Sequence, residues 1–158
     1  MADLHDVADY LIIKCTEGGV SLNLLKLQKL LYYCQAWNLA LGRGRLFEGG
    51  FQAWVHGPVN RSLYDRFSLT KSLYSPVCSR DVRQDFDGNR IIAPEKELID
   101  AVLNVYGGYT GDQLESMTHN EEPWILARGG ISPMDRCETT ISEDVMGTFY
   151  KSRLKDKQ

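Results

Sequence analysis

The stretch that decides the fold class lies at residues 24–41 and reads LLKLQKLLYYCQAWNLAL. Its apolar side chains fall on most faces of an α-helix instead of forming one stripe. A helix of this kind is usually buried, with neighbours on several sides. Ser21 or Asn23 can cap its start, and Gly42 can end it. We therefore predict a central helix that begins at about residue 22 or 24 and ends at Leu41.

The central helix also carries polar side chains whose surroundings need an explanation. They are Lys26, Gln28, Lys29, Gln35 and Asn38. Burying such a group without a hydrogen-bond partner costs about 1–3 kcal/mol. These side chains must therefore face solvent, find partners within the chain, or contact another protein. The sequence leaves these three alternatives open.

The segments around the central helix are mostly helical in pattern. Apolar residues recur with helical spacing from Leu4 to Cys15, and Asp3 can cap that helix. Thr118 and Glu121 fit a capping box for a later helix. Further helices are expected over residues 60–69, 94–106, 110–117, 118–128 and 142–154. The expected apolar stripe of the second of these consists of Leu98, Ala101, Val102 and Val105.

Two segments have extended or turn character. Residues 51–55 alternate modestly, and Asp87-Gly88 between residues 82–86 and 89–93 predicts a two-residue hairpin. The charged tail, residues 152–158, is expected to fray. No repeat or linker divides the chain. We therefore predict a mainly α fold, a compact single-domain helical bundle over residues 1–158 around the central apolar helix, with a small β-hairpin.

Composition excludes several classes of protein. The chain has 158 residues, 43% hydrophobic and 25% charged, with a net charge of −3. These values suit one globular domain and argue against disorder and against a strongly basic nucleic-acid binder. The uncharged run at residues 30–42 is shorter than the ~20 residues that cross a bilayer. Because the N-terminus is acidic and lacks the pattern of a signal peptide, we expect a cytoplasmic protein with no membrane partner.

Metal and redox chemistry have little support in the sequence. The four cysteines, Cys15, Cys34, Cys78 and Cys137, form no Cys-x-x-Cys pair. We expect free thiols, with two disulfides as the alternative. The histidines are far apart, so we expect no metal site and no cofactor.

Catalysis and nucleic-acid binding are weaker interpretations than protein binding. His119 beside Glu121 and Glu122 could act as a general base, but acidic residues at a helix start explain the same pattern. Lys26, Lys29, Arg43 and Arg45 hint at nucleic acid, yet the central helix is too apolar to lie in a groove. Large amphipathic side chains in or near turns often anchor protein interfaces. Here these are Trp54, Tyr64 and Trp124.

Several segments together resemble one known family. Residues 25–37, LKLQKLLYYCQAW, resemble the signature LKLQKLLYYAQAW of the Panacea antitoxin-domain family, which includes SocA-like and GepA-like phage-associated proteins. Cys34 stands where that signature has alanine. Further matches follow in the family's order. They lie at residues 6–10, 46–47, 53–59, 118–128 and 141–150.

The resemblance implies a mostly helical domain without catalysis, encoded in some cases in prophages. It implies an antitoxin that binds and neutralises a cognate toxin protein, or a protease adaptor that delivers the toxin for degradation. We therefore expect no catalytic residue. The expected partner-binding or family-motif residues are Lys26, Gln28, Lys29, Gln35, Trp54, His56, Tyr64, His119 and Trp124.

Overall fold

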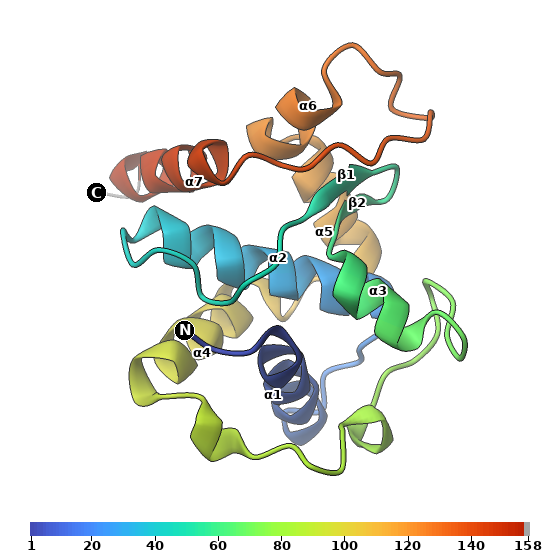
Figure 1. Ribbon diagram of the computed structural model, residues 1–158, viewed down its shortest axis with the longest axis vertical. Helices are drawn as coiled ribbons and strands as arrows, with labels where there is room; N and C mark the ends of the chain where they lie inside the picture. Colours follow the sequence, from blue (N-terminus) through green and yellow to red (C-terminus); the bar gives the residue numbers. More distant parts are fainter. Residues whose placement is uncertain (157–158) are drawn as a thin grey trace.

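The computed structural model describes residues 1–156 of the chain (Figure 1). The helices are α1 (Leu4–Glu17), α2 (Leu24–Ala40), α3 (Arg61–Phe67), α4 (Ala93–Tyr106), α5 (Gly111–His119), α6 (Glu122–Arg128) and α7 (Glu143–Asp156). Two short strands, β1 (Gln52–Trp54) and β2 (Gly57–Val59), form an antiparallel hairpin. The predicted class, mainly α with one small hairpin, is confirmed.

Helix α2 is the predicted central helix. Asn23 caps it, because its side-chain oxygen accepts a hydrogen bond from the Lys26 backbone N–H at 2.8 Å. Helices α1, α4, α5 and α7 all contact α2. Figure 1 shows α7 along one side of α2, with α1 and α4 on the other side. Contacts on several sides explain why the apolar residues of α2 form no single stripe.

The hairpin forms at residues 52–59, and the hairpin predicted at residues 82–93 is wrong. Those residues form an irregular segment with a 3₁₀ turn at Gly88–Arg90, where the Asp87 carboxylate accepts a hydrogen bond from the Asn89 N–H. The segment's arginines bond to α1, so the two halves of the predicted hairpin do not pair with each other.

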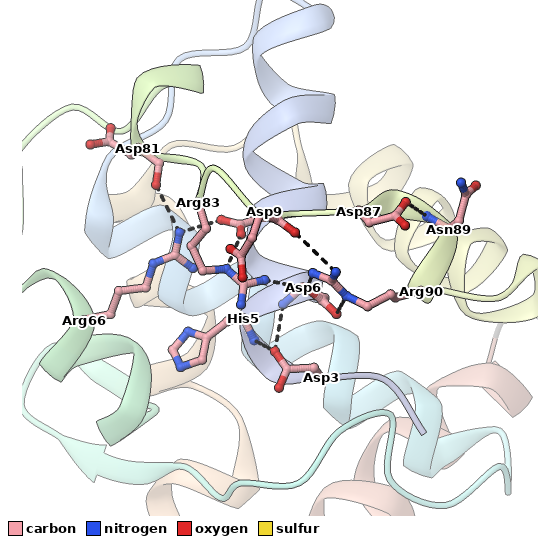
Figure 2. Close-up of polar contacts among 11 residues, drawn as sticks. Asp3, His5, Asp6, Asp9, Arg66, Asp81, Arg83, Asp87, Asn89 and Arg90 are labelled. Atoms are coloured by element: carbon pink, nitrogen blue, oxygen red, sulfur yellow. Dashed lines mark hydrogen bonds and ion pairs between the residues drawn. The ribbon is translucent and has the colours of Figure 1, made fainter.

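An ion-pair cluster attaches this irregular segment to α1 (Figure 2). Asp9 accepts from Arg66 of α3 at 2.5 Å and from Arg83 at 2.7 Å. Asp6 accepts from both Arg83 and Arg90. Both carboxylates are buried. The hydrogen bonds from Arg90 and Arg83 hold the pKa of Asp6 below its usual value, against the opposing effect of burial. The cluster therefore joins three separate segments, α1, α3 and residues 83–90, by charge.

The apolar stripe of α4 differs from the sequence prediction. In α4, Ala101 and Val105 are exposed, while Ile99 and Tyr106 join Leu98 and Val102 in the core. The stripe shifts because α4 packs against both α1 and α2. 

Two further predictions, for the later helices, are wrong. The predicted capping box of Thr118 and Glu121 does not form. Thr118 lies inside α5, and Glu121 is the residue before α6. Helix α7 continues to Asp156, so residues 152–156 are helical where a frayed tail was predicted. Residues 157–158 of that predicted tail lie outside the described residues.

The four cysteines are free thiols, as expected, and Cys15, Cys34 and Cys137 are buried. Across residues 1–156, none of the helices combines the length and apolar character needed to cross a bilayer. In the same range, no three His, Cys, Asp or Glu side chains gather in a way that could hold a metal ion.

Candidate functional site

The polar side chains of α2 find partners within the chain. Lys26 Nζ donates to the Gly107 carbonyl at 2.7 Å, and Lys29 Nζ donates to the Pro58 carbonyl at 3.0 Å. Both lysines are buried. Of the three alternatives that the sequence leaves open, internal pairing is therefore the one the structure shows for these two residues.

The two glutamines of the same helix each hold a loop through both ends of the amide. Gln28 accepts from the Asn60 N–H at 2.9 Å and donates to the Asn60 carbonyl at 3.1 Å. Gln35 accepts from the Leu46 N–H at 2.8 Å and donates to the Phe47 carbonyl at 2.8 Å. These side chains replace backbone hydrogen bonds that the loops cannot make among themselves. They act as internal supports for the hairpin and for the segment before it.

Lys29 has the most unusual surroundings of this group. Its side chain is fully buried beneath β2, and burial lowers its pKa to about 7, with Glu115 partly opposing the shift. Gly57 has φ +100°, and a Cβ there would lie 2.5 Å from Lys29 Cε. A glycine is thus required at the turn so that the hairpin can lie directly over the lysine.

His119 and Trp124 also support the hairpin. His119 Nε2 donates to the Val55 carbonyl at 2.8 Å, and its ring stacks on Trp124 with centroids 4.2 Å apart. Trp124 Nε1 donates to the Trp54 carbonyl at 2.8 Å. Burial lowers the pKa of His119, which favours the neutral imidazole.

The grouping of His119 with Glu121 that an enzyme would need does not form. The Glu121 carboxylate accepts hydrogen bonds from the Tyr33 and Tyr150 hydroxyls, each at 2.8 Å. Burial raises its pKa. His119 instead bonds to the hairpin backbone. The two groups therefore have separate hydrogen-bond partners.

The remaining predicted residues lie around a groove of about 520 Å³ between the hairpin and α3. Trp54 is half-buried, and Tyr64 is 39% exposed. Their rings meet edge to face with centroids 5.0 Å apart, and the Arg61 guanidinium lies 5.6 Å from the Trp54 ring. His56 is exposed at the tip of the hairpin, with Nδ1 2.9 Å from Glu115 Oε1. We call this site the Trp54–Tyr64 groove.

The rest of the groove combines an apolar lining with charged side chains. Leu24, Val59 and Leu73 contribute apolar surface. Arg136 donates to Glu138 at 2.7 Å, and Arg61 lies 3.6 Å from the same carboxylate. Sequence reasoning missed Arg61, Arg136 and Glu138, because no local motif marks them and only the fold brings them together.

Comparisons with known proteins agree with the resemblance in the sequence. A family model described as "Antitoxin SocA-like, Panacea domain" matches residues 27–125. The chain belongs to this SocA-like Panacea family. Antitoxin SocA of Caulobacter vibrioides (strain NA1000 / CB15N) is 31% identical over 137 residues, covering 80% of this chain and 71% of that protein. No solved structure matches the chain.

The region matched by the SocA-like family model includes part of the groove. Residues 27–125 contain Trp54, Tyr64 and Arg61, whereas Arg136 and Glu138 follow the matched region. The same region contains most of α2 and the whole hairpin. The family assignment thus covers the internal supports and the aromatic side of the groove, but not its second arginine.

Proposed function

We propose that this chain is a cytoplasmic antitoxin that neutralises a cognate toxin protein by direct contact at the Trp54–Tyr64 groove. One observation carries the choice of surface. The polar α2 side chains predicted for partner binding are turned inward, whereas Trp54, His56 and Tyr64 remain accessible around one hollow. Half-buried aromatic residues beside an arginine are typical anchors of protein interfaces.

The mechanism we propose is occlusion. The toxin would place part of its active or target-binding surface against the groove, and the complex would keep that surface away from its target. The internal hydrogen bonds of Gln28, Lys29 and His119 support this proposal, because they hold the hairpin in one position before binding. A preformed surface loses less conformational entropy when a partner binds.

The test is rescue of toxicity by co-expression with the product of the adjacent gene. That product should stop growth alone, permit growth with this chain, and co-purify with it. Tyr64→Ala should weaken the complex about thirtyfold, since interface aromatics that anchor binding contribute about 2 kcal/mol or more. Tyr109→Ala is the matched control, because Tyr109 is 41% exposed and lies outside the groove.

The results separate neutralisation from delivery to a protease. A stable complex with unchanged toxin levels supports occlusion. Rapid loss of the toxin, dependent on one cellular protease, would replace occlusion with the adaptor alternative. A harmless adjacent product that does not co-purify would contradict both.

A further inference from the structure

The Trp54–Tyr64 groove has a charge pattern opposite to that of the whole chain. The chain has a net charge of −3. The groove is lined by three cationic side chains, those of Arg61, Lys71 and Arg136, and by the carboxylate of Glu138. Arg61 and Arg136 share the one carboxylate of the lining, Glu138, and this surplus of guanidinium groups favours an acidic partner surface.

The three cations differ in what they can offer a partner. Lys71 Nζ donates to the Pro76 carbonyl at 2.7 Å and lies 3.2 Å from Asp81, so it is used within the chain. Arg61 and Arg136 are 52% and 85% exposed. Both contact the Glu138 carboxylate, and Arg61 also lies 4.0 Å from exposed Asp65. Such exposed ion pairs contribute little stability and exchange readily for other partners.

The groove also selects for an apolar group. The aromatic pair Trp54 and Tyr64 and the apolar side chains of Leu24, Val59 and Leu73 line the same groove as the two arginines. A hollow of about 520 Å³ falls within the size range of binding pockets and can accept a large apolar side chain. The site therefore presents apolar surface next to two guanidinium groups.

We propose that the groove receives an acidic segment of the toxin, in which carboxylates flank a large apolar side chain. This inference rests on the proposed function and names the chemistry of the partner at the same site. The apolar side chain packs against Trp54 and Tyr64, and the carboxylates accept hydrogen bonds from Arg61 and Arg136. Guanidinium groups suit this role because they bind carboxylates through two parallel hydrogen bonds.

A nucleic-acid strand fits the groove less well. Stacking on aromatic residues and contact with arginine would suit a single strand, but a backbone also needs a continuous series of cations. Here Glu138 lies 2.7 Å from Arg136 and 3.6 Å from Arg61. Glu138 repels a phosphate and a partner carboxylate alike, so what disfavours a strand is that this groove offers two exposed arginines instead of a continuous series of cations. An acidic side chain of a protein segment can approach one arginine at a time.

The first experiment uses the complex with the co-purified toxin. The double variant Arg61→Glu/Arg136→Glu should weaken binding about tenfold or more, mainly by slowing association, as rim charges do. Raising NaCl from about 50 to about 300 mM should weaken the wild-type complex and affect the double variant less. Arg43→Glu, an exposed change outside the groove, should behave as wild type. Unfolding curves check that all variants are folded.

The outcomes distinguish this inference from the proposed function. If Tyr64→Ala weakens the complex but the double variant and salt do not, the antitoxin proposal stands and the acidic segment is excluded. If no toxin is captured, the proposed function fails, and the charge preference is measured with labelled peptides alone.

The peptide probe is a fluorescein-labelled peptide with glutamates around a leucine and a phenylalanine. It should bind wild type more tightly than the double variant, and more tightly than a peptide with lysines in place of the glutamates. Equal binding of the two peptides, or tighter binding of a labelled oligothymidylate, would overturn the inference.

Discussion

The fully buried Lys29 makes a quantitative prediction about stability against pH. The side chain has an ordinary pKa of 10.5 in the unfolded chain, and burial lowers it to about 7 in the folded protein. Between these two values the unfolded chain holds a proton that the folded chain has released. Stability therefore rises as the pH rises through this window.

The magnitude follows from the two pKa values. Each pH unit within the window changes the free energy of unfolding by about 1.4 kcal/mol for one proton. At pH 7 the folded lysine is still about half protonated, so the full slope is reached only above that pH. The contribution of Lys29 is therefore about 2 kcal/mol of added stability over this range.

The assay compares urea unfolding of wild type and Lys29→Met at pH 7, 8 and 9. Methionine is unbranched, fits an apolar site and does not titrate. Burial raises the pKa of Cys15 and Cys34. Their effect on stability at high pH has the opposite sign, but it is the same in both proteins. The difference in unfolding free energy between wild type and Lys29→Met should therefore shift by about 2 kcal/mol in favour of wild type from pH 7 to pH 9.

The control is Lys14→Met, since Lys14 is exposed. Lys14→Met removes one charge from the surface, and the shift for Lys29→Met is measured against it. A difference for Lys29→Met that changes by less than about 0.5 kcal/mol would refute the reasoning. It would mean that Lys29 remains protonated when folded, with its charge stabilised by more than the Pro58 carbonyl.

Four further substitutions test the ion-pair cluster at Asp6 and Asp9 and the buried hydrogen bonds of Gln35 and Glu121. Asp9→Asn should lower the free energy of unfolding by about 3 kcal/mol in urea melts, because it removes the buried carboxylate that Arg66 and Arg83 share and leaves Arg83 with Asp6 alone, whereas exposed Asp65→Asn should have little effect. Gln35→Ala should cost about 2–3 kcal/mol by leaving loop groups at Leu46 and Phe47 unpaired; a neutral result in the same assay would show that water replaces the amide. Glu121→Gln should be neutral or stabilising at pH 7 in a thermal melt, because burial raises the pKa of that carboxyl and the amide keeps an acceptor for the tyrosines; a large loss would contradict it. The pKa of Asp6 lies below its ordinary 3.8, so its contribution is present above that value and is lost as the pH falls through the lowered pKa; acid titration of Asp6→Asn should show a shallower loss than wild type.

Local chemistry made much of the fold predictable. The all-round apolar pattern of residues 24–41 predicted a central helix, and Asp3 and Asn23 cap α1 and α2 as side chains of that type do. The family signature lies in the same segment. Because these features depend on residues that are close together in the sequence, they could be predicted without a structure.

The errors arose where distant segments compete for a residue. Asp87-Gly88 is a good local hairpin signal, but Arg83 and Arg90 on either side bond to the carboxylates of α1. Ala101 and Val105 fit a helical stripe, yet the positions of α1 and α2 bury a neighbouring face of α4. Neither outcome could be read from local spacing.

The candidate site, too, could be predicted from the sequence only in part. Sequence alone selected Trp54, His56 and Tyr64 as candidate contact residues. It could not decide that Lys26 and Lys29 are internal, since a lysine three residues from another is equally compatible with solvent or a partner. Only the backbone carbonyls of Gly107 and Pro58, brought over α2 by the fold, account for their burial.

By itself, then, the sequence determined the helical class and the central helix, because short-range periodicity encodes them, and the signature at residues 25–37 pointed to the SocA-like family by resemblance. Only the tertiary structure decided which polar residues of α2 lie inside, where the hairpin forms, and which arginines line the groove. Burial and ion pairing depend on contacts between residues far apart in the chain, and those distances exist only once the chain has folded.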